Sequence, residues 1–592
     1  MGSISVALSR PGVPDEAVVE EMIRAAPHRG SRTKTIQHGS VSLGVAASED
    51  HDDGHLGVDG DVAVVLAGSV DNVAELAREA GQAGQAPQSL DPADILIAAY
   101  RAFGLDLPAR LRGVFGGVVS DRDRIMAFRD HLGFGPVFFG RDARGVRVAS
   151  EAKQVVAGAG VAEEPDLDVC EEIYFQTYDE HTPSALRGVE RLPKASVLLA
   201  DGSGARLRRY WDPTDRFESG RYGPEEIKER FDHLMGQAVA RTLTGKDAVS
   251  LSGGIDSPAV AAYGAAPHLE MAGRPLGGVS AVYPDFPAVD ESEYTRLVAD
   301  DLGMPLHLYR QQARPLDRLD EWTRLTDGPV PTVSLPQYEE HYRLVRSLGY
   351  RSVLSGEFAE FVFDLFAYLI PYLVWHGRWG AVARLLGDRR ARGGSWASVL
   401  RSLANPFVPM RVTAYRWARS RTDIPVWLDR RRVNEPAVKS IVPARERWAK
   451  VQLSPFSGVG LTMEADDVCQ QLCGLTCRRP WADVDLWEFF LSLPAEVKFP
   501  DTRGKTLIRG LLRGRVPDQI LNRRDKTYFD DSVRASIDYP TLRRWLTDPP
   551  HRLKGVRYDL LRERLDGGTL ELSEFRWAKD LASVHAFLSR WD

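Results

Sequence analysis

The order of apolar and polar positions divides the chain into three regions. Up to about residue 210, short β-rich runs such as residues 62–67 are broken by Gly, Asp and Asn turns, and residues 94–103 have the apolar face of a helix. Residues 211–223 are polar and contain Pro and Gly, which is typical of a linker. We therefore expect an N-terminal domain over residues 1–210 and a C-terminal domain over residues 224–592.

Strands and helices alternate after the linker. An amphipathic helix at residues 225–243 precedes a short strand at 248–251, and a second strand is expected at 278–283. A helix at residues 291–302 then leads to a short strand at 305–309. This alternation is typical of an α/β fold with a parallel sheet, in which ligands bind at the carboxyl ends of the strands.

Composition and charge narrow the class of protein. The 592 residues are 43% hydrophobic and 27% charged, which is ordinary for a soluble globular protein. The 76 basic and 82 acidic residues give a net charge of −6, so the overall charge does not favour nucleic acid. The first residues do not resemble a signal peptide, and the longest apolar stretch, residues 361–375, is too short and too interrupted to span a bilayer. We expect a cytoplasmic enzyme with neither a nucleic-acid nor a membrane partner.

The chain has four cysteines, too few for a disulfide-stapled secreted scaffold. Cys469, Cys473 and Cys477 recur every fourth residue, on one face of a helix. This spacing is not a common zinc or iron–sulfur pattern, and no His lies nearby in the sequence. We therefore expect three buried thiols that pack as small apolar groups.

The string VSLSGGIDS at residues 249–257 carries the strongest chemical signal. A buried strand ends at Leu251, two glycines turn the chain, and Pro258 follows at the start of a helix, where its missing N–H costs little. Glycines let backbone N–H groups approach an anion, and the helix N-terminus adds positive potential. The loop lacks the Lys of the Walker pattern, so it is a different phosphate cradle, and Asp256 beside it suits a Mg²⁺ ion bridging to pyrophosphate.

Further strings extend this signal along the chain. SGGIDS resembles the pyrophosphatase loop of ATP-dependent synthetases that adenylate a carboxylate. VLSGE at residues 353–357 is similar to a second nucleotide motif, CRRPWAD at 477–483 to an R-x-P-F-x-D string, and LNRRDKTYF at 521–529 to the R-x-K-x-x-F string that carries a catalytic Lys. In this order the strings resemble those of the asparagine synthetase superfamily, which includes asparagine synthetase, β-lactam synthetase and the lasso-peptide cyclases.

The resemblance implies a site. Lys526 would stabilise negative charge in the transition states, and Glu357 would orient or deprotonate an attacking amine. Mg²⁺ would lie on Asp256 and Glu360, the latter in place of an Asp of the family motif. Phe358 replaces a family Gly, which we expect to alter the acceptor side of the pocket. The positions that would bind ATP are Leu251, Ser252, Gly253, Gly254, Asp256, Ser257, Val282, Ser355 and Gly356.

The N-terminal region resembles a class II glutamine amidotransferase domain, an N-terminal-nucleophile sandwich of two antiparallel sheets between helices. The strings that carry this resemblance are GVFGG at residues 113–117, RDHLGFGP at 129–136 and ASEAK at 149–153. They predict an αββα arrangement for residues 1–210. The complete prediction is thus an α/β protein with an amidotransferase-like domain followed by an adenine-nucleotide-α-hydrolase-like synthetase domain.

The amidotransferase domain departs from its family at the nucleophile. That activity needs Cys at position 2, whose thiol hydrolyses glutamine, and this chain has Gly2. The family's Asn-Gly turn aligns with Ala67 and Gly68, and its substrate-binding Arg and Asp fall near Ala46 and Pro92. We expect a structural relic that makes no ammonia, so the amine must come from elsewhere, which favours a branch of the family that uses an amine on the substrate itself.

A long insertion, about residues 368–444, separates the second nucleotide motif from the later strings. Between Arg378 and Arg432 the chain has 13 Arg, no Lys and three acidic residues, against the negative charge of the whole protein. Two interpretations remain open, a solvated helical face and a docking surface for an acidic or extended peptide. A surface that binds nucleic acid is a third interpretation, and no base-reading motif supports it. The insertion ends in IPVWLD at residues 424–429, which resembles actinobacterial lasso-peptide cyclases.

The function predicted from these resemblances is that of a lasso-peptide cyclase that uses ATP and Mg²⁺. It would adenylate an Asp or Glu side chain of a precursor peptide and join it to the peptide's N-terminal amine, releasing AMP and pyrophosphate. Its expected partners are the core peptide, a leader-peptide-binding protein and a leader peptidase. The alternatives are a β-lactam-synthetase-like ligase, an ammonia-dependent asparagine-synthetase-like ligase and, in another class, a degenerate nucleotide-binding scaffold.

Overall fold

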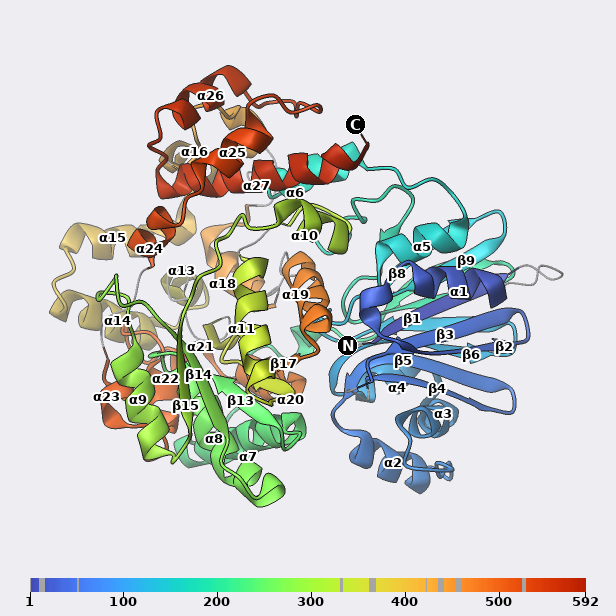
Figure 1. Ribbon diagram of the computed structural model, residues 1–592. Helices are drawn as coiled ribbons and strands as arrows, with labels where there is room; N and C mark the ends of the chain where they lie inside the picture. Colours follow the sequence, from blue (N-terminus) through green and yellow to red (C-terminus); the bar gives the residue numbers. More distant parts are fainter. Residues whose placement is uncertain are drawn as a thin grey trace.

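The computed structural model describes residues 2–9, 16–49, 53–330, 334–360, 369–421, 423–434, 441–453, 460–523 and 529–591. Figure 1 shows the β-rich N-terminal domain, in blue and cyan, on one side of the larger C-terminal domain. No helix within these ranges is both long and apolar enough to cross a membrane.

The N-terminal domain is built on two antiparallel sheets. Apolar side chains such as Ile4, Leu43 and Val65 fill the space between them. The first sheet has the order β10 (Glu190–Arg191), β8 (Phe138–Asp142), β9 (Gly145–Ala149), β1 (Ser3–Ser9), β3 (Val41–Ala47) and β2 (Arg32–His38). The second has the order β12 (Gly204–Arg209), β11 (Ser196–Asp201), β7 (Arg124–Arg129), β6 (Gly113–Asp121), β5 (Val62–Val70) and β4 (Gly54–Asp59).

Helices cover the outer face of each sheet and complete the αββα arrangement. Helices α1 (Glu16–Arg24) and α5 (Ala152–Ala159) pack on the first sheet, and α2 (Val73–Gln82) and α3 (Pro92–Phe103) pack at the second. The remaining elements of the domain are η1 (Pro27–Arg29), η2 (Gly104–Asp106), α4 (Leu107–Arg110) and α6 (Leu167–Tyr174). The sandwich expected from the amidotransferase resemblance is confirmed.

The C-terminal domain contains the predicted parallel sheet. Its strands run in the order β15 (Leu306–Arg310), β14 (Gly277–Val282), β13 (Asp247–Ser250), β16 (Ser352–Leu354) and β17 (Thr476–Arg478). One face packs against α7 (Pro224–Thr242), α8 (Asp256–Ala272) and α9 (Ser292–Asp301), and the other against α11 (Leu335–Ser347) and α19 (Gly460–Cys473). The strands and helices predicted after the linker are confirmed, with each bound shifted by one residue.

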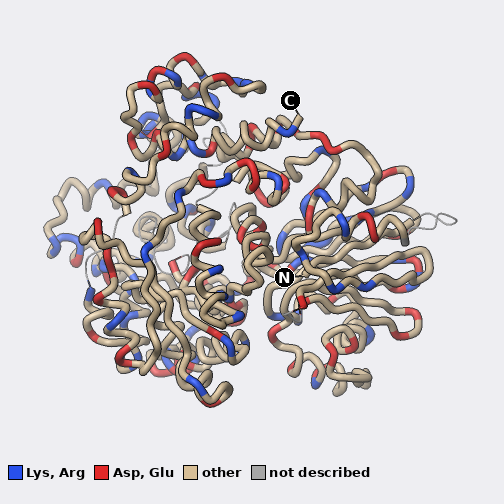
Figure 2. Tube along the Cα trace, viewed as in Figure 1, with Lys and Arg blue, Asp and Glu red and all other residues tan. Residues whose placement is uncertain are grey.

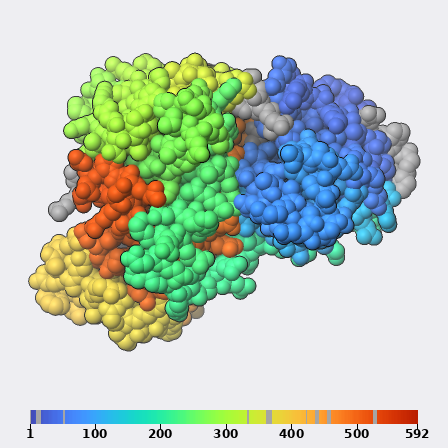
Figure 3. Space-filling view, turned by 90° about the horizontal axis from the view of Figure 1, so that it is seen from below, coloured from blue at the N-terminus to red at the C-terminus, as the bar shows by residue number. Residues whose placement is uncertain are grey.

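The helices of the insertion between residues 369 and 420 project away from the N-terminal domain, and Figure 1 shows them in yellow and tan, apart from the blue domain. Figure 3 shows the same separation of the yellow atoms from the blue atoms. The insertion buries residues such as Tyr372 and Leu385 in a small core that it shares with Ala495 and Phe499. Its elements are α13 (Leu369–Trp375), α14 (Trp379–Ala391), α15 (Trp396–Ala404), η5 (Asn405–Phe407), α16 (Met410–Ser420) and α18 (Ala444–Leu453).

The segment predicted as a linker packs closely on the C-terminal domain. Trp211 Nε1 donates to Glu488 Oε1 at 2.7 Å, and the ring of Phe217 lies 5.5 Å from that of Trp448 in the insertion. Glu218 accepts hydrogen bonds from Tyr372 at 2.6 Å and from Arg378 at 2.8 Å. The segment, which includes η3 (Pro213–Arg216), therefore joins the insertion to the body of the protein.

The last helices form a cluster shared with the N-terminal domain. Trp427, in the IPVWLD string, is fully buried there, and Asp429 N donates to Gly555 O at 2.8 Å. The string is thus a structural anchor of the insertion. The helices after β17 are η6 (Pro480–Ala482), α20 (Val484–Ser492), α21 (Ala495–Lys498), α22 (Thr506–Leu511), α23 (Asp518–Leu521), α24 (Asp530–Ala535), α25 (Tyr539–Leu546), α26 (Tyr558–Asp566), α27 (Leu572–Leu588) and η7 (Ser589–Trp591), and α10 (Leu319–Leu325) packs on α27.

Candidate active site

The two nucleotide motifs meet at the carboxyl edge of the parallel sheet. Val249 of β13 pairs with Leu354 of β16, so the loops that follow these strands start side by side. Leu251 N donates to Val279 O on β14 at 2.9 Å, which places Val282 at the same edge. The sheet thereby brings together the predicted ATP-binding positions, as expected for a ligand site in this fold.

Two backbone N–H groups of the loop after β13 donate to side-chain oxygens. Ser257 Oγ accepts from Ser252 N at 2.9 Å and lies 3.0 Å from Ser252 Oγ, which closes the turn around the glycines. Gly253 N donates to the carboxylate of Glu291 at 2.8 Å. An amide that already binds a carboxylate oxygen has the chemistry of a phosphate donor. Arg523 Nη1 contacts both Glu291 Oε1 at 2.8 Å and Gly253 O at 2.7 Å.

Gly356 lets the second motif touch the first. A Cβ on this residue would lie 2.4 Å from Ser257 N and 2.8 Å from the carbonyl carbon of Asp256, distances that side-chain atoms do not adopt. Trp481, buried behind the loop, donates from Nε1 to Asp256 O at 3.0 Å. The start of α8, which belongs to the first nucleotide motif, therefore lies between the second nucleotide motif and the R-x-P string.

Asp256, Glu360 and Lys505 form a charged group beside the loop. Lys505 Nζ lies 2.6 Å from Asp256 Oδ2. Burial raises the pKa of Glu360, and the negative charge of Asp256 adds to this while Lys505 acts against it. Two carboxylates that repel each other at a phosphate-binding loop suit a cation. Among the described residues, no group of three or more His, Cys, Asp or Glu side chains is arranged so that it could hold a metal ion.

Glu357, whose side chain is 36% exposed, belongs to a partly buried network of polar side chains. One oxygen accepts from Arg479 Nε at 2.7 Å and the other from the Tyr338 hydroxyl at 3.3 Å. Arg479 also pairs with Asp466, which accepts a hydrogen bond from Tyr342 at 2.7 Å. Because both oxygens of Glu357 already accept hydrogen bonds, the arrangement favours orientation of an amine by charge over removal of its proton.

A groove extends from Val282 along the edge of the sheet. It has a volume of about 300 Å³ and is lined by residues that follow β14 and β15 and by α24. The rings of Tyr283 and Phe529 meet edge to face across it, with centroids 5.4 Å apart. Phe529 is the last residue of the R-x-K-x-x-F string, whose Lys526 lies outside the described residues.

The structure corrects the interpretation of Phe358. Its side chain is 4% exposed and packs on Phe134 of the N-terminal domain, with ring centroids 4.9 Å apart. The substitution therefore does not reshape the acceptor side but adds an apolar contact between the domains. The backbone has φ of +76°, which is rare for a bulky residue and requires support from its surroundings.

The amidotransferase pocket lacks room for its nucleophile. A Cβ on Gly2 would lie 2.4 Å from Ala46 O and 3.1 Å from Asp53 O. The amide of Gly68, in the aligned Asn-Gly turn, donates to Asp53 O at 2.9 Å. The backbone carbonyl groups of Ala46 and Asp53 thus occupy the space that a side chain at position 2 would need.

We therefore expect no glutaminase activity, and Gly2→Cys should not create it. The thiol would clash with the Ala46 carbonyl unless β1 and β3 moved apart. Glutamate release from glutamine, measured on the purified protein and on the variant, checks this expectation. Release above the buffer rate by the wild type would contradict it.

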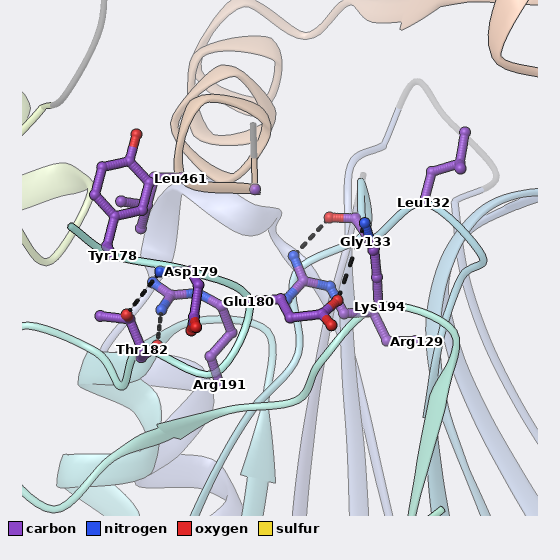
Figure 4. Close-up of a pocket in the computed structure, with 11 residues that line it drawn as sticks. Arg129, Leu132, Gly133, Tyr178, Asp179, Glu180, Thr182, Arg191, Lys194 and Leu461 are labelled. Carbon is purple, nitrogen blue, oxygen red and sulfur yellow. Dashed lines mark hydrogen bonds and ion pairs between the residues drawn. The ribbon is translucent and has the colours of Figure 1, made fainter. Parts of the chain in front are cut away.

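A cavity between the domains near β7 and α19 is too small to be a substrate site. Figure 4 shows Arg129, Arg191 and Lys194 pointing into it, each paired with a neighbour such as Glu180 or the carbonyl of Thr182. Its volume of about 30 Å³ holds one water molecule. Arg129 and Arg191 also pair with Glu464 of α19, at 2.9 and 2.7 Å, so these two cations join the N-terminal domain to the C-terminal domain.

The three cysteines that sequence analysis singled out are free and buried, as expected. They do not share one helix, because Cys469 and Cys473 lie in α19 whereas Cys477 lies in β17 of the parallel sheet. Conversely, the contacts of Lys505, Glu291 and Arg523 with the loop were missed. The Gly-Lys pair directly before α22 was a signal for Lys505, and Arg523 lies in the LNRRDKTYF string, whereas Glu291 is brought to the loop only by folding.

The chain was compared with known proteins. Residues 230–587 match the asparagine synthase family, and residues 1–211 match the glutamine amidotransferase domain. Asparagine synthetase [glutamine-hydrolyzing] 3 of Bacillus subtilis (strain 168) is 24% identical over 487 residues, covering 78% of this chain and 75% of the relative. Carboxyethyl-arginine beta-lactam-synthase of Streptomyces clavuligerus is 25% identical over 464 residues, covering 78% of this chain and 72% of the relative.

The family match covers more than half of the chain and includes both nucleotide motifs and the R-x-P string. The chain belongs to the asparagine synthase family and is an ATP-dependent, AMP-forming amide ligase with an N-terminal amidotransferase-type domain.

Proposed function

We propose that this ligase is a lasso-peptide cyclase, which closes a ring between an Asp or Glu side chain and the N-terminal amine of a precursor peptide. The observation that carries the proposal is an intact nucleotide loop combined with an amidotransferase pocket that has Gly2 and no space for a thiol. A ligase that makes no ammonia must obtain its amine from elsewhere, which supports an amine carried by the substrate itself. The long insertion, with its exposed aromatic and basic side chains, favours a peptide over a small amino acid.

The first step is adenylation. A carboxylate oxygen of the peptide attacks the α-phosphorus of ATP, and pyrophosphate leaves. The N–H groups after β13, the hydroxyls of Ser252 and Ser257, and the ammonium of Lys505 would bind the departing phosphates. Leu251, Val282, Ser355 and Gly356 would frame the adenosine.

Asp256 and Glu360 would hold Mg²⁺ together with phosphate oxygens. The ion would neutralise charge that develops on pyrophosphate. Lys505, whose Nζ lies 2.6 Å from Asp256, would then share its charge between the carboxylate and the phosphates.

The second step forms the amide bond. The N-terminal amine attacks the acyl carbon, AMP leaves and the amine gives up a proton. Glu357, held by Arg479 and Tyr338, would orient the amine, and Lys526 would stabilise the negative charge of the transition state. Because amine and carboxylate belong to one peptide, a site that holds it folded makes the attack intramolecular, which is worth about 7 to 11 kcal/mol.

The groove beside Val282 and the surface of the insertion would receive the rest of the peptide. Half of the large apolar side chains that are exposed in the described ranges lie between residues 375 and 426. Figure 2 marks the basic residues of these helices in blue. Recognition surfaces are typically rich in aromatic residues, Met and Arg, and poor in Lys. The exposed residues are Trp375, Trp379, Trp396, Leu400, Phe407, Met410, Val412, Tyr415 and Val426.

Neutralising this surface should weaken peptide binding. We would change Arg384, Arg401, Arg411 and Arg416 to Gln, because they are exposed and make no ion pair with another described residue. The KM for the peptide should rise several-fold while that for ATP stays unchanged, and added salt should reproduce part of the effect, since exposed charges are screened over about 10 Å at 0.1 M ionic strength.

The matched control removes the same charge elsewhere. Arg24, Arg78, Arg124 and Arg206 are exposed on the N-terminal domain, and their change to Gln should leave the KM for the peptide unchanged. If the insertion variant keeps wild-type peptide kinetics at low salt, the insertion surface is only a solvated helical face.

The experiment that tests the function uses the purified protein with ATP, MgCl₂ and synthetic core peptides encoded beside its gene. We expect AMP, pyrophosphate and a product lighter by one water, whose N-terminus resists an aminopeptidase. A second candidate is a β-lactam-synthetase-like ligase, favoured by the 25% identity to the Streptomyces enzyme over 464 residues. Turnover with a small β-amino acid but with none of the peptides would favour that candidate.

A further inference from the structure

The carboxylate of Asp388 joins the insertion to the segment that carries Lys505. Asp388 lies in the last part of α14, and its Oδ2 accepts from Thr502 N at 2.9 Å and from the Thr502 hydroxyl. Arg392 Nε donates to the same oxygen at 2.9 Å. Hydrogen bonds from Arg392 and Thr502 lower the pKa of Asp388, so the carboxylate is ionised when it makes these bonds.

The segment from Asp501 to Thr506 is a tight turn. Asp501 Oδ1 accepts from Arg503 N at 2.9 Å and from Thr506 Oγ1 at 2.6 Å. Gly504 and Lys505 have φ of +70° and +53°, two successive residues in the left-handed region. This conformation is sparsely populated for Lys and persists only where the surroundings over-determine it.

The turn aims Lys505 at the nucleotide site. Lys505 is the last residue before α22, and its Nζ reaches Asp256 Oδ2 at 2.6 Å, at the start of α8. A connected path of hydrogen bonds and backbone thus runs from α14 of the insertion through Thr502 to the ammonium beside the phosphate loop.

We propose that Asp388 is a positioning residue that holds the turn at Thr502 and so keeps Lys505 directed at the phosphates of ATP. The insertion is then part of the machinery for nucleotide binding as well as a surface for the peptide. The proposal does not depend on the identity of the amine substrate, because ATP binding is common to every ligase of this family.

The test measures Mg-ATP binding to the full chain by calorimetry, without any peptide. Asp388→Ala should raise the Kd roughly tenfold, as expected when support for a charged ligand-binding group is removed. Asp388→Asn, which keeps one acceptor oxygen, should lie between the wild type and Asp388→Ala. In turnover assays the KM for ATP should rise and the KM for the peptide should not.

A double-mutant cycle with Lys505→Ala separates positioning from general destabilisation. In the Lys505→Ala background, Asp388→Ala should have no further effect on the Kd, because the group it positions is gone. Fully additive losses would overturn the proposal. Asp423→Ala is the matched control, since Asp423 pairs with Arg421 in the insertion and not with the turn at residues 501–506, and it should leave the Kd unchanged.

Folding of the variants is checked by Tm. If Asp388→Ala does not fold, Thr502→Val removes the hydroxyl donor alone and should raise the Kd in the same direction. An unchanged Kd in folded Asp388→Ala and Thr502→Val would also contradict the proposal. If the positioning role of Asp388 is disproved but the protein still cyclises a peptide, the proposed function is unaffected.

Discussion

Asp256→Ala is expected to abolish product formation, with a loss on the order of 10³-fold or more. A metal that neutralises developing phosphate charge contributes several kcal/mol, and each 1.36 kcal/mol corresponds to a factor of about ten. Asp256 is central because it starts α8, lies at the phosphate loop and pairs with Lys505. The loss should appear both as weaker Mg-ATP binding and as a lower kcat.

Asp256→Asn sharpens this test, because it keeps the shape of the side chain and removes its charge. Binding of ATP without Mg²⁺ should not weaken in this variant, since the ammonium of Lys505 is released from its carboxylate partner toward the phosphates. Equal weakening of metal-free ATP and Mg-ATP would mean that Asp256 acts on the loop structure and not on the metal. Tm values of both variants control for unfolding.

Lys526→Ala is expected to slow the chemistry by about 10² to 10³-fold while ATP affinity stays nearly unchanged. An interaction made mainly in the transition state lowers kcat and leaves ground-state binding alone. Single-turnover rates at saturating ATP and peptide measure the effect. Lys505→Ala is the matched comparison, since it should mainly raise the Kd for ATP.

The two lysine variants should therefore differ in the quantity that changes, which is the rate of the chemistry for Lys526→Ala and the Kd for ATP for Lys505→Ala. A Lys526→Ala enzyme that turns over at the wild-type rate would show that this residue is not in the active site. If the Lys526→Ala enzyme loses ATP binding but keeps its rate in single turnover, Lys526 has the role in ATP binding that we assign to Lys505.

The parallel sheet and the nucleotide loop could be predicted from the sequence because their signals are local. A strand followed by Ser-Gly-Gly-x-Asp-Ser and then a helix encodes both the turn and the anion site within nine residues. The loss of the amidotransferase nucleophile was equally local, since one residue, Gly2, decides it. Periodic apolar positions also gave the helices after the linker, such as α7.

Contacts between distant segments could not be predicted in the same way. The ring of Phe358 packs on Phe134, more than 200 residues earlier, and this contact reverses the interpretation of a substitution that looked like a change to the pocket. Similarly, Glu291 accepts a hydrogen bond from Gly253 N, and Arg523 donates to Gly253 O and to Glu291. Arg523 lies in the LNRRDKTYF string, but the sequence does not show that it pairs with Glu291, because this pairing depends on how α9 and the segment after α23 pack at the sheet edge.

The sequence by itself determined the α/β class, the phosphate-binding loop and the absence of a glutaminase nucleophile, since each depends on residues within one turn or one strand. Only the tertiary structure decided that Lys505 meets Asp256, that Arg479 and Tyr338 hold Glu357, and that Asp388 ties the insertion to the nucleotide site. The physical reason is that the pairing of charged side chains depends on the distance between their atoms after folding, and a one-dimensional pattern does not contain that distance.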